Sequence, residues 1–176
     1  MNTEKDIVVQ FSKTKILAQI GLVLFLIFFF GLLLFTFTSE STARTTLFQV
    51  IAIPLITVLV LLFFSNIRRL FTNSPGIVIN AKGITDNSSY HGVGFIPWND
   101  ISSLSVAQIR YNQYLVLGVV NPQKYISRGN LLLRVQRLAN NVFFNSPIFI
   151  ISNSLEIDFS EMVDLIKHSY RKFKSA

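Results

Sequence analysis

The chain has 176 residues, of which 51% are hydrophobic and only 14% are charged, and its net charge at neutral pH is +7. Soluble domains usually carry about 25% charged residues, so this composition argues against a wholly soluble protein. There is no cysteine, which excludes disulfides, thiolate metal sites and cysteine nucleophiles, and only two histidines are present.

Two long apolar segments lie in the first half of the chain. The first, residues 16–35, contains a single polar side chain, Gln19. A helix of about 20 residues rises roughly 30 Å, which matches the hydrocarbon thickness of a bilayer. The second segment, residues 47–67, is almost as apolar and contains Pro54, which a membrane helix tolerates as a kink. The pattern predicts a two-helix transmembrane hairpin.

Basic residues flank this hairpin on both outer sides, and Lys and Arg mark the cytoplasmic face of a membrane. Lys13 and Lys15 precede the first helix. Arg68 and Arg69 follow the second helix, whereas the linker carries only Arg44. Both termini are therefore expected in the cytoplasm. The chain then divides into a cytoplasmic N-terminal segment, the hairpin and a cytoplasmic domain: residues 1–15, 16–67 (helices at about 16–37 and 47–67) and 68–176.

A cleaved signal peptide is the alternative for the first helix. Ser41-Thr42-Ala43 has the small residues of a cleavage site. However, the apolar core of a signal peptide has only about 7–15 residues, and this segment is longer. In either case the second helix leaves the C-terminal part in the cytoplasm.

The segment after the hairpin consists of short β-branched and aromatic runs separated by turn residues, which predicts a β-rich domain. Pro122 is expected to open a helical turn, and residues 130–144 have helical spacing. The segment that follows Asp158 has the apolar stripe and the basic C-terminal half of an amphipathic helix. Asp158 or Ser160 can cap this helix. The fold class is therefore α+β, with strands predicted at residues 77–80, 84–86, 90–98, 101–109, 114–120, 148–151 and 155–159.

Several turn and strand motifs follow the hairpin: Pro75-Gly76-Ile77-Val78-Ile79-Asn80, Gly83-Ile84, Asp86-Asn87-Ser88-Ser89, Ile96-Pro97-Trp98-Asn99-Asp100-Ile101, Asn121-Pro122-Gln123-Lys124-Tyr125-Ile126 and Asn153-Ser154-Leu155. With the hairpin, they resemble a family of small two-pass bacterial inner-membrane proteins whose members are mostly uncharacterised. The resemblance implies a cytoplasmic pleckstrin-homology-like (PH-like) domain. Such a domain is a split β-barrel closed by a C-terminal helix, and residues 122–144 would add a helical insert. The resemblance also implies the bacterial inner membrane as location and carries no catalytic residues.

The sequence contains no phosphate-binding loop, nucleophile elbow or zinc-binding helix motif. His91 with Asp86 and Asp100 offers the one route to catalysis, and it lacks a nucleophile with its base and orienting group. Glu156 and Asp158 supply too few oxygens for a hard cation. We therefore expect neither an enzyme nor a cofactor.

Basic side chains are the clearest functional signal. The chain has no acid between Asp100 and Glu156. Each Lys or Arg near an anionic membrane surface contributes about 1 kcal/mol of attraction. Leu131 to Leu133 and Phe143 to Phe144 lie in the same segment and suit insertion into a membrane interface. The candidate lipid or partner contacts are Arg110, Lys124, Arg128, Arg134 and Arg137. The alternative is that these residues only solvate the surface and obey the positive-inside bias.

These observations favour a non-enzymatic, membrane-anchored binding module at the inner leaflet, in contact with a protein partner or with anionic lipid headgroups. A toxin-immunity protein is one variant of this function. The alternative is an accessory subunit of a larger membrane transport or envelope-assembly complex. Nucleic acid is not an expected partner, because the motifs of nucleic-acid-binding domains are missing.

Overall fold

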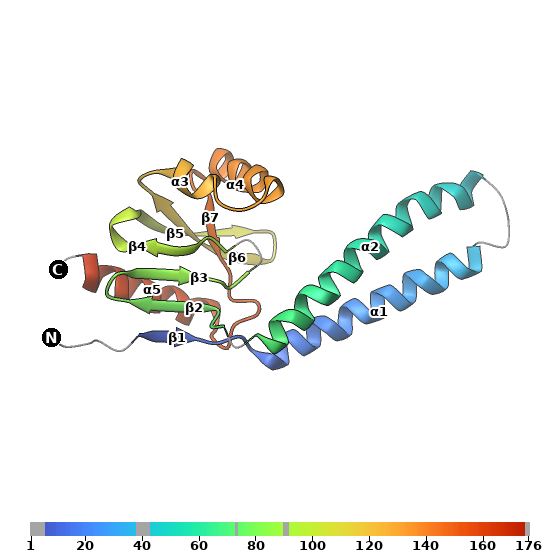
Figure 1. Cartoon of the computed structure of the whole chain (residues 1–176), viewed down its shortest axis with the longest axis horizontal. Coiled ribbons are helices and arrows are strands. Elements are labelled where there is room, and N and C mark those ends of the chain that lie inside the picture. The colour runs from blue at the N-terminus through green and yellow to red at the C-terminus, as the bar shows by residue number, and fades with distance from the viewer. Residues whose placement is uncertain (1–5, 38–42, 73, 90–91, 175–176) are drawn as a thin grey trace. The chain divides into compact units, whose positions relative to one another are not determined.

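The computed structural model describes residues 6–37, 43–72, 74–89 and 92–174 (Figure 1). The chain is α+β and forms two compact units. One unit is the helical pair, Ser12–Asn73. The other is a domain that combines Met1–Phe11 with Ser74–Ala176. The helical pair is thus inserted into the domain in sequence, and the segment before the first helix belongs to the domain.

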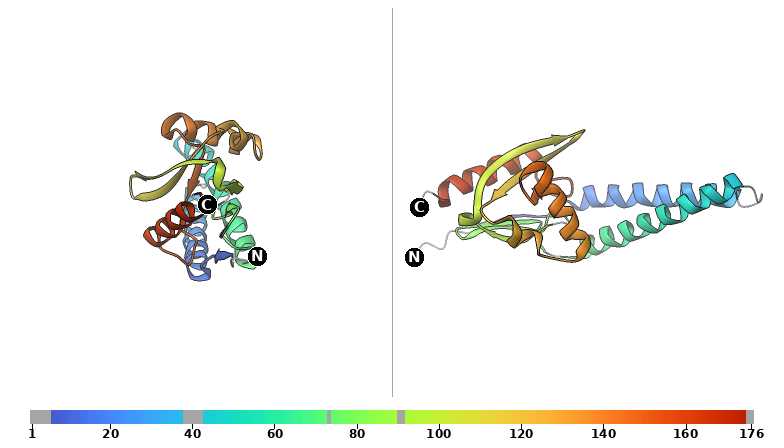
Figure 2. Two further views of the ribbon diagram at one scale, coloured as in Figure 1. Left: turned by 90° about the vertical axis from the view of Figure 1, so that its left-hand side faces the viewer. Right: turned by 90° about the horizontal axis from the view of Figure 1, so that it is seen from above.

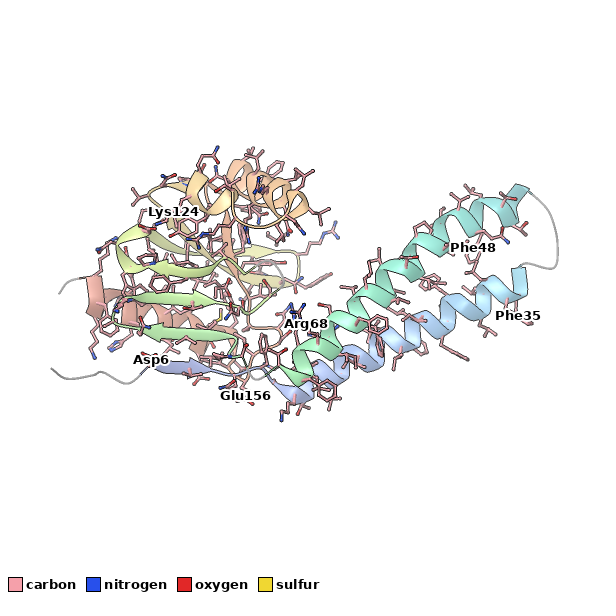
Figure 3. All side chains as sticks on the ribbon, in the orientation of Figure 1. Asp6, Phe35, Phe48, Arg68, Lys124 and Glu156 are labelled. Atoms are coloured by element: carbon pink, nitrogen blue, oxygen red, sulfur yellow. The ribbon has the colours of Figure 1, made fainter. Side chains whose placement is uncertain are left out.

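The helical pair consists of α1 (Lys13–Phe37) and α2 (Ala43–Phe71). Both are long and apolar enough to cross a membrane, over Lys13–Thr36 and Thr45–Phe71, and only 17% and 11% of their most apolar windows are buried. Carbon atoms dominate along both helices in Figure 3, while nitrogens gather at the Arg68 end. Apolar side chains exposed on this scale are typical of helices that lie in lipid. The two predicted apolar helices are confirmed, and they indicate a membrane protein.

The domain contains two antiparallel sheets. The first has four strands in chain order: β1 (Ile7–Val9), β2 (Ile77–Asn80), β3 (Gly83–Asp86) and β4 (Gly94–Pro97). The second has three: β5 (Ile101–Ile109), β6 (Asn112–Val119) and β7 (Ile148–Ile150).

Strand β1 was not predicted from the sequence. It pairs with β2 so that Ile7 faces Ile79 and Val9 faces Ile77. The backbone N–H of Gly76 extends the ladder by donating to the Val9 carbonyl at 2.9 Å. Both connections between the domain and the helical pair therefore leave the domain at the same end of the first sheet.

Helices complete the domain. A 3₁₀ turn (Trp98–Asp100) joins β4 to β5, and α3 (Pro122–Ile126), α4 (Leu131–Phe144) and α5 (Phe159–Lys174) follow. Asn121 and Asn130 cap α3 and α4 by accepting the N–H groups of Lys124 and Leu133, respectively. The helical turn, the helix after residue 130 and the C-terminal helix are all confirmed.

The core lies between the two sheets and α5. Met162 and Ile166 of α5 are fully buried against it, as are Ile84 and Leu117 of the sheets. Trp98 is 3% exposed. Its ring stacks on Phe173 at 6.2 Å, and its indole N–H donates to the Asn80 carbonyl at 2.8 Å. Trp98 therefore anchors the core and ties α5 to the first sheet.

Two strand predictions need correction. The predicted strand at residues 155–159 is wrong: Leu155 makes only an isolated bridge to Phe11, and α5 begins at Phe159. Leu155 and Ile157 are buried, so the alternation of apolar residues came from an irregular segment packed on the core. The strand predicted over residues 90–98 is shorter, because β4 begins at Gly94, whose φ is +73°. Its first two residues lie outside the described part of the chain.

Candidate functional site

Helix α4 presents its apolar side chains to the outside of the domain. Leu131 is 77% exposed and Phe143 is 76% exposed, whereas Arg137 on the same helix is only 3% exposed. A surface helix of a globular protein normally has the opposite arrangement. We call the exposed side chains the α4 face: Leu131, Leu132, Val135, Leu138, Val142 and Phe143. Apolar patches of this kind mark contact surfaces.

Arg137 explains why α4 is turned this way. One guanidinium nitrogen, Nη1, donates to the carbonyls of Tyr125 and Arg128, and the other, Nη2, donates to the Gly92 carbonyl at 3.2 Å. Burial lowers the pKa of Arg137, although an arginine remains protonated in proteins. The side chain therefore fastens α4 to the loop before β4, which leaves the opposite, apolar side of the helix outward.

Arg128 fastens the same insert to the edge of the first sheet. Its Nη1 donates to the carbonyls of Val93 and Phe95 at 2.8 and 3.0 Å, and its guanidinium lies 4.5 Å from the centre of the Tyr125 ring. Strand β4 is the last strand of its sheet, so these carbonyls have no neighbouring strand. Arg128 occupies part of the place that a further strand would take.

Lys124 lies beside these arginines and has an acidic partner. Its ammonium nitrogen is 2.5 Å from a carboxylate oxygen of Asp100, which also accepts the Tyr125 hydroxyl at 2.5 Å. These two hydrogen bonds hold the pKa of Asp100 below its usual range. Burial and the Asp100 carboxylate raise the pKa of Tyr125. The charge of Lys124 is therefore largely balanced within the domain.

The five basic residues predicted as contacts fall into two groups. Lys124, Arg128 and Arg137 lie around Tyr125 and form hydrogen bonds within the domain, although Lys124 itself is exposed. Arg134 is exposed on α4, where its Nε donates to the Gly129 carbonyl at 3.1 Å. Arg110 is exposed at the turn between β5 and β6. Arg134 and Arg110 are thus exposed cations, whereas the exposed Lys124 already has Asp100 as its partner.

Asp86 is the last residue of β3. The carboxylate is buried, with Oδ1 accepting the backbone N–H and the hydroxyl of Ser88. Its Oδ2 has no hydrogen-bond partner among the described residues. Burial raises the pKa of Asp86, while the hydrogen bonds from Ser88 and the nearby charge of Arg137 act against that rise. No sequence signal indicates this burial, because Asp86 is followed directly by the polar residues Asn87-Ser88-Ser89.

The possible catalytic groups do not form a site in the described part of the chain. Asp86 is buried next to Ser88, whereas Asp100 is paired with Lys124 and Tyr125. His91 lies outside the described residues. Within those residues, no three His, Cys, Asp or Glu side chains group together as metal ligands.

Helix α4 lies toward one end of the domain. In Figure 1 and in the right-hand view of Figure 2, α4 and the tip of the β5–β6 hairpin lie toward the end at which β1 ends and β2 begins. This is the end from which the chain leaves for α1 and to which it returns from α2.

Comparison with known protein families, with curated proteins and with solved structures finds no match for this chain. The α4 face, with Arg134 beside it, is the exposed feature of the domain that best fits a contact surface.

Proposed function

We propose that this protein is a non-enzymatic, membrane-anchored binding module that lays its α4 face on the inner leaflet of the cell membrane. The observation that carries the proposal is the contrast on one helix between the buried Arg137 and the exposed Leu131 and Phe143. A helix that buries its polar side and exposes apolar side chains is unfavourable in water. The same arrangement is favourable when the apolar side of the helix lies at the boundary between headgroups and acyl chains.

The connection to the membrane favours lipid as the occupant of the α4 face. Helix α1 begins two residues after Phe11, and α2 ends three residues before Ser74. The end of the domain that carries α4 is therefore joined to both membrane segments by only a few residues. Tethering of this kind keeps the local concentration of bilayer surface high. Arg134, on the same helix, adds attraction to anionic headgroups.

The pairing of β1 with β2 supports the proposed topology. The two strands are adjacent in one sheet, although both membrane helices separate them in sequence. Two crossings return the chain to its starting side. We therefore place both termini on one side, and the flanking Lys and Arg residues favour the cytoplasm. The sheets of four and three strands with α5 against the core are compatible with a PH-like split barrel, which remains part of the proposal.

A single-cysteine experiment tests the proposed contact, because the chain contains no cysteine of its own. Val135→Cys on the α4 face carries the fluorophore NBD, and the full-length protein is reconstituted into phosphatidylcholine vesicles with and without phosphatidylglycerol. We expect blue-shifted emission and quenching by doxyl-labelled lipid, both stronger with phosphatidylglycerol. Val120→Cys is the matched control, since Val120 is 71% exposed and directly follows the end of β6 that is remote from Tyr111.

A water-like spectrum at position 135, equal to that at position 120, would overturn the proposal. If the label at 135 is in water in vesicles but shielded in native membranes, a protein partner covers the α4 face. That outcome would favour the accessory-subunit alternative.

A further inference from the structure

The β5–β6 hairpin ends in a two-residue turn with unusual occupants. Ile109 and Asn112 form the last pair of the ladder, so Arg110 and Tyr111 make the turn. Tyr111 is 99% exposed, the highest value among the large apolar side chains that are exposed. An aromatic ring held fully in solvent at a hairpin tip makes no contribution to the core.

The backbone of this turn would form more easily with smaller residues. Arg110 has a φ of +55°, in the left-handed region that costs a residue with a side chain about 1 kcal/mol. Gly, Asn and Asp are the usual residues in hairpin turns with positive φ. The chain instead places a cation and a phenol there. Strain of this kind is characteristic of functional positions.

The chemistry of the tip matches the headgroup region of a bilayer. Tyrosine rings concentrate at the membrane–water interface, with the ring toward apolar atoms and the hydroxyl toward water. Arginine binds phosphate through charge-assisted hydrogen bonds. Val106 and Ile109 behind the tip are 47% and 36% exposed. A hollow of about 250 Å³ beside Tyr111 is lined largely by amide side chains, including Gln108, Asn112 and Gln113, which suits polar headgroups.

We propose that the tip of the β5–β6 hairpin is a second bilayer contact, in which Tyr111 enters the headgroup region and Arg110 binds lipid phosphate. This inference rests on the proposed function, because it requires the end of the domain that carries α4 to face the membrane. The tip and α4 come from separate elements at that end (Figures 1 and 2). Two separated contacts would restrict rotation of the domain about its connections to α1 and α2.

The test uses the full-length protein in vesicles of phosphatidylcholine and phosphatidylglycerol. Asn112→Cys carries NBD beside an intact Tyr111, and Val120→Cys at the other end of β6 is the control. We expect a blue shift and doxyl-lipid quenching at position 112 and neither at position 120. Adding Tyr111→Ser should reduce the quenching at 112, and adding Arg110→Ser should reduce its dependence on phosphatidylglycerol.

Labels at positions 135 and 112, examined in separate proteins, distinguish the two proposals. Quenching at 135 with a water-like signal at 112 overturns the hairpin contact and leaves the α4 contact intact. Quenching at 112 with a water-like signal at 135 overturns the α4 contact and leaves the hairpin contact. Quenching at 112 that is unchanged by Tyr111→Ser overturns the role assigned to Tyr111. Unchanged emission of the single tryptophan, Trp98, verifies that each variant is folded.

Discussion

Arg137 donates a hydrogen bond to the carbonyl of Gly92, 45 residues earlier in the chain, at 3.2 Å. The same guanidinium donates to the carbonyls of Tyr125 and Arg128. One side chain therefore joins α4, the end of α3 and the loop before β4. Because these hydrogen bonds hold the Arg137 side of α4 against the domain, the apolar residues lie on the outer side of the helix. The exposed, apolar α4 face is thus linked to an internal polar junction on the opposite side of the same helix.

Replacing Arg137 by Met should destabilise the domain strongly. The substitution leaves buried carbonyl groups without a donor, and breaking a buried charged network typically costs about 3–5 kcal/mol. Thermal unfolding of the full-length protein in mild detergent, followed by Trp98 fluorescence, measures the effect. Arg134→Met is the matched control on the same helix. It should change stability by about 0.5 kcal/mol or less, since Arg134 is exposed. Equal effects of the two substitutions would contradict the internal role of Arg137.

Charge reversal should separate membrane binding from folding. Arg134→Glu places an acid beside the α4 face and should reduce doxyl-lipid quenching of a label at Val135 in anionic vesicles, with little change in melting temperature. Arg128→Glu should instead lower the melting temperature, because its partners are the carbonyls of Val93 and Phe95. Quenching and melting curves recorded on the same preparations compare the two. An Arg128→Glu variant with an unchanged melting temperature would show that the hydrogen bonds from Arg128 to Val93 and Phe95 are dispensable.

The pH dependence of stability should reflect Asp86. Burial raises the pKa of Asp86 in the folded domain, so folding favours the protonated carboxyl group. The associated stability is fully present below the unfolded pKa of about 3.9 and is lost as the pH rises through the folded pKa. In the Asp86→Asn variant the side chain cannot ionise, but its amide oxygen can still accept the hydrogen bonds from Ser88. Its melting temperature relative to the natural protein should therefore increase as the pH rises from acid toward neutrality. Parallel melting profiles for the two proteins would show that Asp86 does not titrate in this way.

The membrane helices should be removable only if β1 is retained. A chain in which a short Gly-Ser linker replaces Ser12–Asn73 keeps Val9 opposite Ile77 and should fold into the domain. A chain that starts at residue 74 lacks β1, exposes the edge of β2 and should aggregate. Size-exclusion chromatography in mild detergent and Trp98 fluorescence distinguish these outcomes. Equal folding of both chains would mean that β1 adds little to the domain.

Local sequence patterns were sufficient to predict the helices of this protein. The apolar spacing of Leu131, Val135, Leu138 and Val142 predicted α4, and two long apolar runs predicted α1 and α2. Periodicity identifies an apolar stripe, but it does not tell which side of the helix faces the core. That depended on Arg137, whose partners lie elsewhere in the chain.

The unpredicted features depend on contacts between distant segments. Strand β1 has three residues, too few for a periodic signal, and its partner lies beyond both membrane helices. The burial of Asp86 and the pairing of Lys124 with Asp100 likewise require the sheets to be in place. Among the candidate basic residues, the sequence identified the positive charge of the segment. It did not distinguish the exposed Arg134 and Arg110 from Arg128 and Arg137, which hold distant main-chain carbonyls, or from Lys124, which pairs with Asp100.

The interruption between β1 and β2 also sets an order of events during synthesis. The ribosome completes β1 first, and both apolar helices must be released before β2 emerges. Until then Ile7 and Val9 have no partner strand. If the nascent chain were to insert with one crossing instead of two, β1 and β2 would lie on opposite sides of the bilayer and the first sheet would stay incomplete. In the proposed topology, completion of the domain therefore depends on correct membrane insertion, and a misinserted chain would leave the edge of β2 without its partner strand.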